Sequence, residues 1–368
     1  MALPSSHASH NLVRRRSAPA STPALPMLNP FKLAADFVAP FSQQLLRGSG
    51  SIFMLHRFAD RERGNGGHDP SIVRADLAYL RRNRYELVSL TELVGRLRDR
   101  DSRLGKTIAF TVDDGYADFA TVGAGLFAEF DCPVTVFIAT GVVDEGGWYW
   151  WDRLRETMAQ AKIRKLDLEV GHEQFSATLG TTELAHKAAR ALTEHVKRVS
   201  DTERRRVLGE VERLLGVDLP AHAPAEFAPM TWDEIRGFAR QGVSFGPHTI
   251  THPIMSQLDD ASARREIEGS WLRLREQTPG TVPIFCYPNG GPQDISRREP
   301  ETLRALGFET AVTATPGYAT ASLWHSSTES PFLLPRFGYN GNPAVFKQVV
   351  TGVLRARLAL RRDGLRVP

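Results

Sequence analysis

The sequence predicts an α/β fold built on a parallel sheet or barrel. Over most of residues 50–340, short apolar segments of strand length alternate with amphipathic segments of helix length. This alternation is typical of parallel strands that are covered by helices. A long charged stretch, residues 142–229, interrupts the pattern with helix-forming sequence. We therefore expect one α/β body that carries a helical insertion.

The predicted strands are short runs rich in β-branched and aromatic residues. Most are apolar along their whole length, as expected for strands covered on both faces. They comprise residues 51–56, 86–90, 107–112, 132–138, 242–246, 282–287, 308–312 and 333–337.

The predicted helices occupy the segments between these strands. Thr231 and Glu234 have the spacing of a capping box, which predicts that a helix begins there. The clearest helical segments are residues 72–82, 120–130, 184–215 and 256–278.

The composition is that of a globular protein, with 42% hydrophobic and 24% charged residues in 368. No run reaches the roughly 18 to 20 apolar residues that span a bilayer. The stretch after Arg16 does not have the apolar character of a signal peptide. We therefore expect a cytoplasmic protein, and we expect both cysteines, Cys132 and Cys286, to be buried thiols.

The basic charge is concentrated at the two ends of the chain. Residues 1–50 and 351–368 each carry a net charge of +4, so the remainder is net negative at −4. This distribution argues against a nucleic-acid groove in the body. We expect residues 1–48 to be a disordered basic segment, in which Pro30–Leu46 is compatible with an amphipathic helix, and residues 346–368 to be a basic helix or tail. Such ends either are solvated or are attracted weakly to an anionic membrane surface.

Two adjacent carboxylates, Asp113 and Asp114, follow the predicted strand 107–112. Neighbouring side chains on a strand point to opposite faces, but a sharp turn at Gly115 would bring both to one pocket. Adjacent acids repel each other, and a bound cation or a shared proton offsets that cost. The pair is therefore either a solvated turn or one half of a catalytic site.

A second polar motif, His248-Thr249-Ile250-Thr251-His252, follows the predicted strand 242–246. Histidines at positions i and i+4 share one face of a helical turn and are a recurrent way to bind zinc. The carboxyl ends of parallel strands meet on one face of a sheet or barrel, so both motifs should open on the same crevice. Two histidines and one carboxylate make a metal site with open positions. The second carboxylate is then free to take a proton from water and drive hydrolysis of an amide or ester.

Together the two motifs, Thr111-Val112-Asp113-Asp114-Gly115-Tyr116 and His248-Thr249-Ile250-Thr251-His252-Pro253, resemble the polysaccharide deacetylase family, the NodB-homology carbohydrate esterases. The resemblance implies a distorted (β/α)7-type barrel over residues 49–345, with 142–229 as its insertion. It also implies that Asp113 is the general base and that Asp114, His248 and His252 bind a divalent metal. The backbone amide of Tyr116 would help to hold the oxyanion.

The chain departs from the family pattern at two positions. Cys286 stands where family members commonly have an arginine that positions the base, and Arg336 is predicted to take over by pairing with Asp113. The usual late histidine, which protonates the leaving amine, is missing after the last strand. His56, at the end of the first strand, resembles the early histidine of the exopolysaccharide branch and is predicted to serve as this acid.

The predicted activity is removal of N-acetyl or other N-acyl groups from an amino sugar in a polysaccharide, oligosaccharide or lipid-linked glycan, with Zn²⁺ favoured as the metal. Tyr287, Pro288 and Asn289 are expected to line the substrate groove. The aromatic cluster that ends at Trp151 is either the core of the insertion or a wall of the cleft. The alternatives are hydrolysis of a non-polymeric amide, including deformylation, and carbohydrate binding by a degenerate site.

Overall fold

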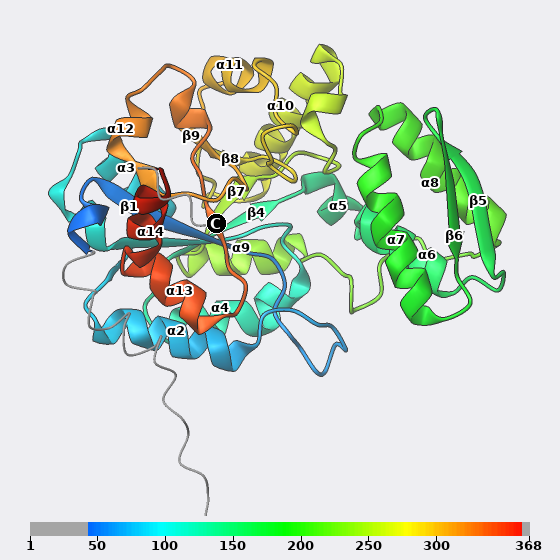
Figure 1. The fold of residues 1–368 in the computed structure, drawn as a ribbon, viewed down its shortest axis with the longest axis horizontal. Helices are drawn as coiled ribbons and strands as arrows, with labels where there is room; N and C mark the ends of the chain where they lie inside the picture. Colours follow the sequence, from blue (N-terminus) through cyan, green and yellow to red (C-terminus); the bar gives the residue numbers. More distant parts are fainter. Residues whose placement is uncertain (1–42, 363–368) are drawn as a thin grey trace, which may run out of the picture.

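The computed structural model describes residues 43–362, and Figure 1 shows their arrangement. An α/β body, with helices on both sides of its strands, carries a smaller lobe formed by part of the insertion (Figure 1). The fold class predicted from the sequence is confirmed. Among the described residues, no helix is long and apolar enough to cross a membrane.

The central sheet has seven strands, and its main path runs β10-β1-β3-β4-β7, with β11 paired to β1 and β2 paired to β3. All pairs are parallel except β1 with β10. The strands are β1 (Ser49–Leu55), β2 (Glu86–Leu87), β3 (Thr107–Val112), β4 (Val134–Ile138), β7 (Ser244–Pro247), β10 (Ala319–Thr320) and β11 (Phe337–Gly338). Every residue of β3 and β4 is buried, which explains their continuous apolar sequence.

Two further strands, β8 (Ile284–Cys286) and β9 (Thr310–Val312), form a separate parallel pair. A single bridge, Phe245 to Thr281, links β7 to the segment before β8, and another, Val312 to Leu334, links β9 to the segment before β11. The strands therefore follow one another around a barrel-like core in which the ladder is reduced to single bridges at two joints. This arrangement accounts for the distortion expected of the barrel.

Helices connect and cover these strands. The capping box of Thr231 and Glu234 is present at the start of α9, as predicted. The helices of the body are α2 (Pro70–Arg82), α3 (Leu90–Arg98), α4 (Ala124–Ala128), α5 (Thr140–Glu145), α9 (Trp232–Arg240), α10 (Asp260–Gln277), α11 (Arg298–Ala305), α12 (Ala321–Trp324), α13 (Pro343–Val350) and α14 (Val353–Arg362). Short 3-10 or π turns add η1 (Gln43–Leu46), η2 (Ser102–Lys106), η3 (Phe119–Gly123), η4 (Met255–Gln257) and η5 (Ser330–Phe332).

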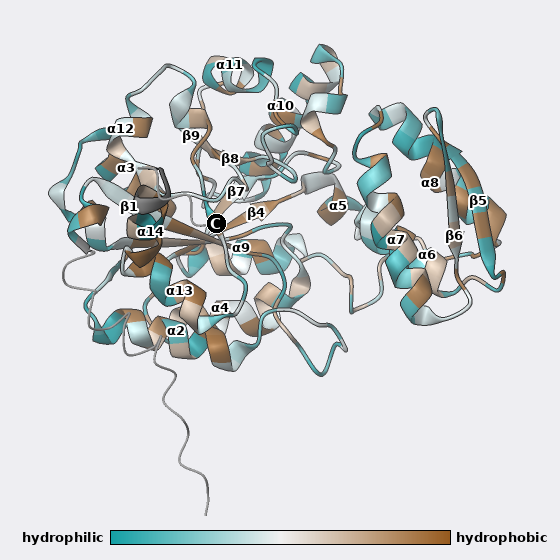
Figure 2. Cartoon of the chain, viewed as in Figure 1, coloured by the Kyte–Doolittle hydropathy of each residue, from teal (hydrophilic) through white to brown (hydrophobic). Residues whose placement is uncertain are grey.

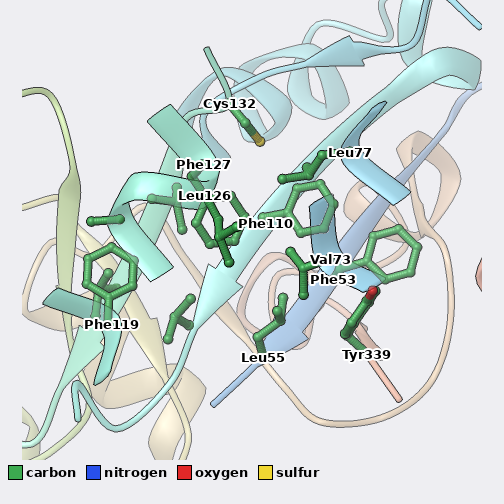
Figure 3. Close-up of a cluster of buried hydrophobic side chains, with 14 of the residues drawn as sticks. Phe53, Leu55, Val73, Leu77, Phe110, Phe119, Leu126, Phe127, Cys132 and Tyr339 are labelled. Atoms are coloured by element: carbon green, nitrogen blue, oxygen red, sulfur yellow. The ribbon is translucent and has the colours of Figure 1, made fainter. Parts of the chain in front are cut away.

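A large hydrophobic cluster fixes the sheet to the helices on one side. Phe53 of β1 stacks on Phe110 of β3, with ring centroids 5.5 Å apart, and Phe127 of α4 packs against Phe110 (Figure 3). Leu77 of α2 is fully buried in the same cluster. Apolar residues of the strands thus gather inside the body, while polar residues cover the outer helix faces (Figure 2). This packing holds the ends of β1 and β3 in fixed positions.

The lobe of the insertion has its own hydrophobic core, separate from that of the body. It contains α6 (Trp150–Ala159), β5 (Lys165–Val170), β6 (Glu173–Thr178), α7 (Thr182–Val196) and α8 (Asp201–Leu215). The β5–β6 hairpin was not predicted, although β5 alternates charged and apolar residues as a half-buried strand does. The hairpin lies on the far side of the lobe, and α6 and α7 lie nearer the body (Figure 1).

The predicted N-terminal segment, residues 1–48, falls largely outside the described residues, whereas most of the C-terminal segment 346–368 is described. Of the proposed amphipathic stretch Pro30–Leu46, the structure describes only the turn η1. At the other end, α13 and α14 are helical, and Arg355 of α14 donates a hydrogen bond to Ser49 at the start of β1.

Candidate active site

Polar residues from the carboxyl ends of several strands meet in one cavity. Asp113 and Asp114 follow β3, His248 follows β7, and His56 follows β1. All four line a cavity of about 520 Å³ that lies between the body and the insertion. The prediction that the two sequence motifs open on the same crevice is confirmed.

Three ligand atoms converge at the base of this cavity. Nε2 of His248 lies 3.5 Å from Oδ1 of Asp114, and Nε2 of His252 lies 3.4 Å from the same oxygen. The side chains of all three residues are buried. Nδ1 of His248 lies 2.7 Å from the carbonyl oxygen of Cys286. Donation of the Nδ1 proton to that carbonyl orients the ring with Nε2 toward Asp114. Burial lowers the pKa of His248, but Cys286 and the hydrogen bond to Asp114 outweigh this effect and raise it above its ordinary value, so a bound cation would have to replace the Nε2 proton.

This donor set fits a divalent metal ion. Oδ1 of Asp114 is buried and has no hydrogen-bond partner among residues 43–362, a costly state unless a cation offsets it. Two ligand atoms that each lie about 2.1 Å from a tetrahedral metal are about 3.4 Å apart. The two histidine nitrogens lie 3.5 and 3.4 Å from Oδ1 of Asp114, which is close to that spacing. Burial lowers the pKa of His252 to about 4, so this imidazole is neutral at neutral pH and available as a ligand.

The loop that carries the two histidines differs from the expected helical turn. Thr249 and His252 have positive φ angles of 67° and 54°, so His248 and His252 converge through a tight loop. Glu266 of α10 holds this loop, since its carboxylate accepts hydrogen bonds from the backbone amides of Ile250 and Thr251 at 2.7 and 3.0 Å. The helical-turn expectation is wrong, because Glu266 from α10 and the hydroxyl of Thr249, which accepts from the amide of His252, satisfy the backbone in place of helical hydrogen bonds.

Arg336 is paired with Asp113 in the interior of the body. Its two terminal nitrogens donate to the two carboxylate oxygens of Asp113 at 2.7 and 2.8 Å, and its side chain is fully buried. It also donates to the carbonyl of Thr313 and the hydroxyl of Thr111, at 2.8 and 2.9 Å. Burial raises the pKa of Asp113, but the charge and hydrogen bonds of Arg336 outweigh that effect and hold the pKa below its usual range. Asp113 is therefore ionised and fixed in orientation.

Cys286 lies against the same ion pair. Its sulfur is 3.2 Å from a terminal nitrogen of Arg336 and 3.4 Å from Oδ2 of Asp113. The residue is buried as a free thiol, as is Cys132. Burial raises the pKa of the Cys286 thiol above its ordinary value, so the sulfur is protonated.

His56 lies at the open side of the site. Its Nε2 is 4.0 Å from Oδ2 of Asp113, and its side chain is 44% exposed. It is therefore within reach of both the base and a substrate in the cavity. This position is compatible with proton transfer to a leaving group.

The turn after the carboxylates orients Tyr116. Asp114 and Gly115 both have positive φ angles, 72° and 67°, so the sharp turn begins one residue earlier than predicted. The amide of Ala117 and the carbonyl of Gly115 bond to the segment before α9, whereas the amide of Tyr116 has no acceptor among the described residues. The Tyr116 amide therefore remains available as a donor. The hydroxyl of Tyr149 donates to the carbonyl of Asp114 and fixes the turn from the insertion side.

The predicted substrate-binding residues divide into two groups. Tyr287, Asn289 and Trp151 line the cavity. The hydroxyl of Tyr287 and the amide nitrogen of Asn289 are buried without hydrogen-bond partners in the described chain. Pro288 is buried and is not among the residues that line the cavity.

The aromatic cluster of the insertion has both of the roles considered from the sequence. Trp148 packs on Phe227, with centroids 5.1 Å apart, and so belongs to the packing of the insertion. Trp151 lines the cavity and stacks on Tyr149. It also contacts His252 edge-on, with ring centroids 4.5 Å apart. The cluster therefore connects the insertion to His252.

One wall of the cavity was not predicted. Helix α7 presents Arg190, Thr193 and Glu194 to it, and Lys197 follows directly as the residue that caps the helix. These residues recur at helical spacing opposite the apolar face that packs in the lobe, so from the sequence they are indistinguishable from a solvated helix face.

Comparison with known proteins agrees with this geometry. Residues 212–311 match the family model of polysaccharide deacetylases, a segment that contains His248 and His252 but not the aspartates. The structure resembles the deacetylase PplD of Streptococcus pyogenes, whose structure contains acetate (TM-score 0.52, 16% identity, 84% of this chain and 98% of that chain). It also resembles BA0330 of Bacillus anthracis, assigned as a polysaccharide deacetylase (TM-score 0.50, 14% identity, 83% of this chain and 69% of that chain). No significant match was found among curated proteins. The predicted family resemblance is confirmed, and the two structures support the fold.

Proposed function

We propose that this polysaccharide deacetylase domain is a metal-dependent hydrolase that removes N-acetyl groups from an amino sugar within a glycan. The main observation behind the proposal is that two adjacent carboxylates have different partners. Asp114 faces two imidazole nitrogens, while Asp113 is held beside them by Arg336. A metal site next to an ionised base in an open cavity is an arrangement that supports metal-assisted hydrolysis of an amide.

The ion would be held by Asp114, His248 and His252, and we propose zinc because it is commonly bound by imidazole and carboxylate ligands. When a divalent ion is bound, the chemistry supplied is polarisation of the acyl carbonyl and acidification of water. Residues of the chain supply the base, the acid, the oxyanion donor and the groups that orient the sugar.

Asp113 takes the proton of the attacking water, because Arg336 keeps its carboxylate ionised and oriented toward the cavity. The amide of Tyr116 donates a hydrogen bond to the oxygen that becomes negatively charged as the carbonyl is attacked. His56, 4.0 Å from Asp113, gives a proton to the nitrogen of the leaving amine. Tyr287, Asn289 and Trp151 form the walls that orient the sugar.

The variant Asp113→Asn tests the proposal. This substitution keeps the shape of the side chain but removes the base, so we expect acetate release from N-acetylglucosamine oligomers to fall by about 100-fold or more, at unchanged metal content. Acetate release at the wild-type rate would contradict the role of Asp113. Acetate release by neither protein from any N-acetylated sugar would favour the carbohydrate-binding alternative.

We also propose that the enzyme acts in the cytoplasm, with peripheral membrane contact through its basic ends. The support is the net charge of +4 on each terminal segment. Flotation of the full chain with anionic vesicles, compared with a chain shortened to begin at Gly48, tests the contribution of the N-terminal segment. Equal partitioning of the two proteins to the vesicles would show that the N-terminal segment does not contribute to membrane contact.

A further inference from the structure

One buried carboxyl group in the wall of the cavity has no part in the proposed mechanism. Asp152 is the third residue of α6 in the insertion, and its buried side chain lines the metal-site cavity. The insertion therefore contributes an acidic group to a site whose other carboxylates, Asp113 and Asp114, follow β3. A buried carboxyl group needs hydrogen-bond donors, so its partners indicate what it does.

The hydroxyl of Tyr116 is the hydrogen-bond donor that Asp152 binds. It donates to Oδ2 of Asp152 at 2.5 Å, and both side chains are buried. Burial and the neighbouring Asp152 raise the pKa of Tyr116 well above its ordinary value, so the hydroxyl keeps the proton that it donates. The other oxygen of Asp152 lies 3.4 Å from a terminal nitrogen of Arg155, one turn further along α6. Asp152 thus offers the tyrosine a fixed acceptor.

The start of α6 is docked on both loops of the metal site. The hydroxyl of Tyr149, the residue before the helix, donates to the carbonyl oxygen of Asp114. The indole nitrogen of Trp150 donates to the carbonyl oxygen of His252 at 3.3 Å. Asp152 follows two residues later in the chain. Its carboxyl group is therefore carried by a segment that is fixed relative to the site.

The ring of Tyr116 is confined by its neighbours. The guanidinium carbon of Arg57 lies 4.0 Å from the centre of the ring, and the ring of Tyr149 packs against it with centroids 4.9 Å apart. Arg57 is itself fixed by a hydrogen bond from its Nε to Asp118, at 2.5 Å. The hydroxyl at the far end of the confined ring connects the turn after β3 to the insertion.

The peptide unit between Gly115 and Tyr116 carries the proposed oxyanion donor. The carbonyl of Gly115 accepts from the amide of Met230 at 2.8 Å, which anchors one side of this unit. The Cα of Tyr116 ends the unit on the other side, and the anchored side chain holds that Cα in place. An oxyanion donor has to be oriented before the charge develops, and a displacement of about 1 Å can cost about 100-fold in rate.

We propose that Asp152 is a positioning residue, which fixes the backbone amide of Tyr116 through the hydroxyl of the same tyrosine. The insertion is then required for catalysis, because it supplies the acceptor that completes the turn after β3. This inference rests on the proposed deacetylase function and adds a residue to it. In this role Asp152 acts through Tyr116 and does not itself transfer a proton.

Kinetics of acetate release from N-acetylglucosamine oligomers by the metal-loaded protein test the inference. Tyr116→Phe removes only the hydroxyl, and Asp152→Ala removes its acceptor. We expect each substitution to lower kcat by about tenfold or more at unchanged KM and metal content, because the amide acts on charge that develops after the substrate has bound. The double variant should lose no more than the worse single variant, because both substitutions remove the same hydrogen bond.

Two further variants separate positioning from other roles. Asp152→Asn keeps an oxygen that can accept from Tyr116, so its kcat should stay within about threefold of the wild type. Tyr339→Phe is the matched control, because it removes another buried hydroxyl that donates to a carboxylate, Asp76, at 2.7 Å. Neither Tyr339 nor Asp76 lines the metal-site cavity. This control should lose as much stability in urea as Tyr116→Phe and keep the wild-type kcat.

A wild-type kcat in Tyr116→Phe would overturn the inference, as would losses that add in the double variant. An equal fall of kcat in the control would overturn it in favour of general destabilisation. If Asp152→Asn were as impaired as Asp152→Ala, a direct role for the carboxylate charge would replace it. All of these outcomes include acetate release by the wild type, so they leave the proposed function in place. Failure of the wild type to release acetate from any N-acetylated sugar would remove the proposed function, and the inference with it.

Discussion

Replacing Arg336 by Gln tests how the proposed base is held. Arg336 donates to both oxygens of Asp113, and the side chains are 0% and 3% exposed. The substitution leaves a buried carboxylate without its cation. Breaking a buried ion pair by removing one partner typically costs about 3–5 kcal/mol. We expect a loss of that size in the free energy of unfolding at neutral pH, measured by urea denaturation.

The same variant should change the pH dependence of stability and of activity. In the wild type the folded-state pKa of Asp113 is below its usual range, so the pair adds stability above the ordinary aspartate pKa of about 4, and this stability is lost as the pH falls through the folded pKa. Without Arg336 the folded pKa rises. The acid limb of the kcat/KM profile should therefore move to higher pH, because the base is protonated sooner.

An exposed arginine provides the control. Nε of Arg74 donates to both oxygens of Glu129 at 3.1 and 2.8 Å, but the two side chains are 48% and 45% exposed. Arg74→Gln should cost less than about 1 kcal/mol and leave the pH profile unchanged. Arg336→Lys keeps the charge but loses the bidentate geometry. Its free energy of unfolding and its acid limb should therefore lie between those of the wild type and of Arg336→Gln. The reasoning is refuted if Arg336→Gln costs no more than the control and its acid limb stays in place.

Three further substitutions address the metal, the acid and the turn. His252→Ala should weaken binding of zinc by more than about 100-fold in a competition titration with a chelator, and retained affinity would remove this residue from the ligand set. His56→Gln should lower kcat by about 100-fold or more at full metal content; an unchanged kcat would assign the leaving-group proton to another donor. Gly115→Ala should lower the free energy of unfolding by about 1–3 kcal/mol because of the positive φ alone. A steric clash should add to this loss, because the new Cβ would lie 2.4 Å from the side chain of Ile138. Gly64→Ala has a similar φ in open space, so equal losses in the two variants would show that the clash adds nothing.

Much of the site could be predicted because its residues follow strands. The carboxylates Asp113 and Asp114 and the histidine His248 stand directly after apolar runs, and strand topology brings such positions to one edge of the fold. The pairing of Arg336 with Asp113 could be anticipated because a buried base needs a cation and the usual arginine is replaced. The positions needed only the order of the strands, whereas the roles and the pairing of Arg336 also rested on the family resemblance.

The unpredicted features depend on contacts between distant segments. Glu266, in the middle of α10, holds the histidine loop, and nothing in the local sequence distinguishes it from other acidic residues on that helix. The face of α7 that lines the cavity has the same polar pattern as a solvated face. The β5–β6 hairpin did have a local signal, the alternation in Lys165–Val170, which the charge-rich helical sequence around it obscured.

The replacement of the usual arginine at Cys286 and the presence of Arg336 are best understood as one structural change. The sulfur of Cys286 lies 3.2 Å from Arg336 and 3.4 Å from Asp113, so a guanidinium on residue 286 would compete with Arg336 for the same carboxylate. Two cations in that buried space would repel each other. A small uncharged thiol instead leaves room for an arginine that enters from the segment before β11 and is anchored on the carbonyl of Thr313. The proposed base, Asp113, thus has a buried cationic partner although residue 286 is not the arginine that the family resemblance implies.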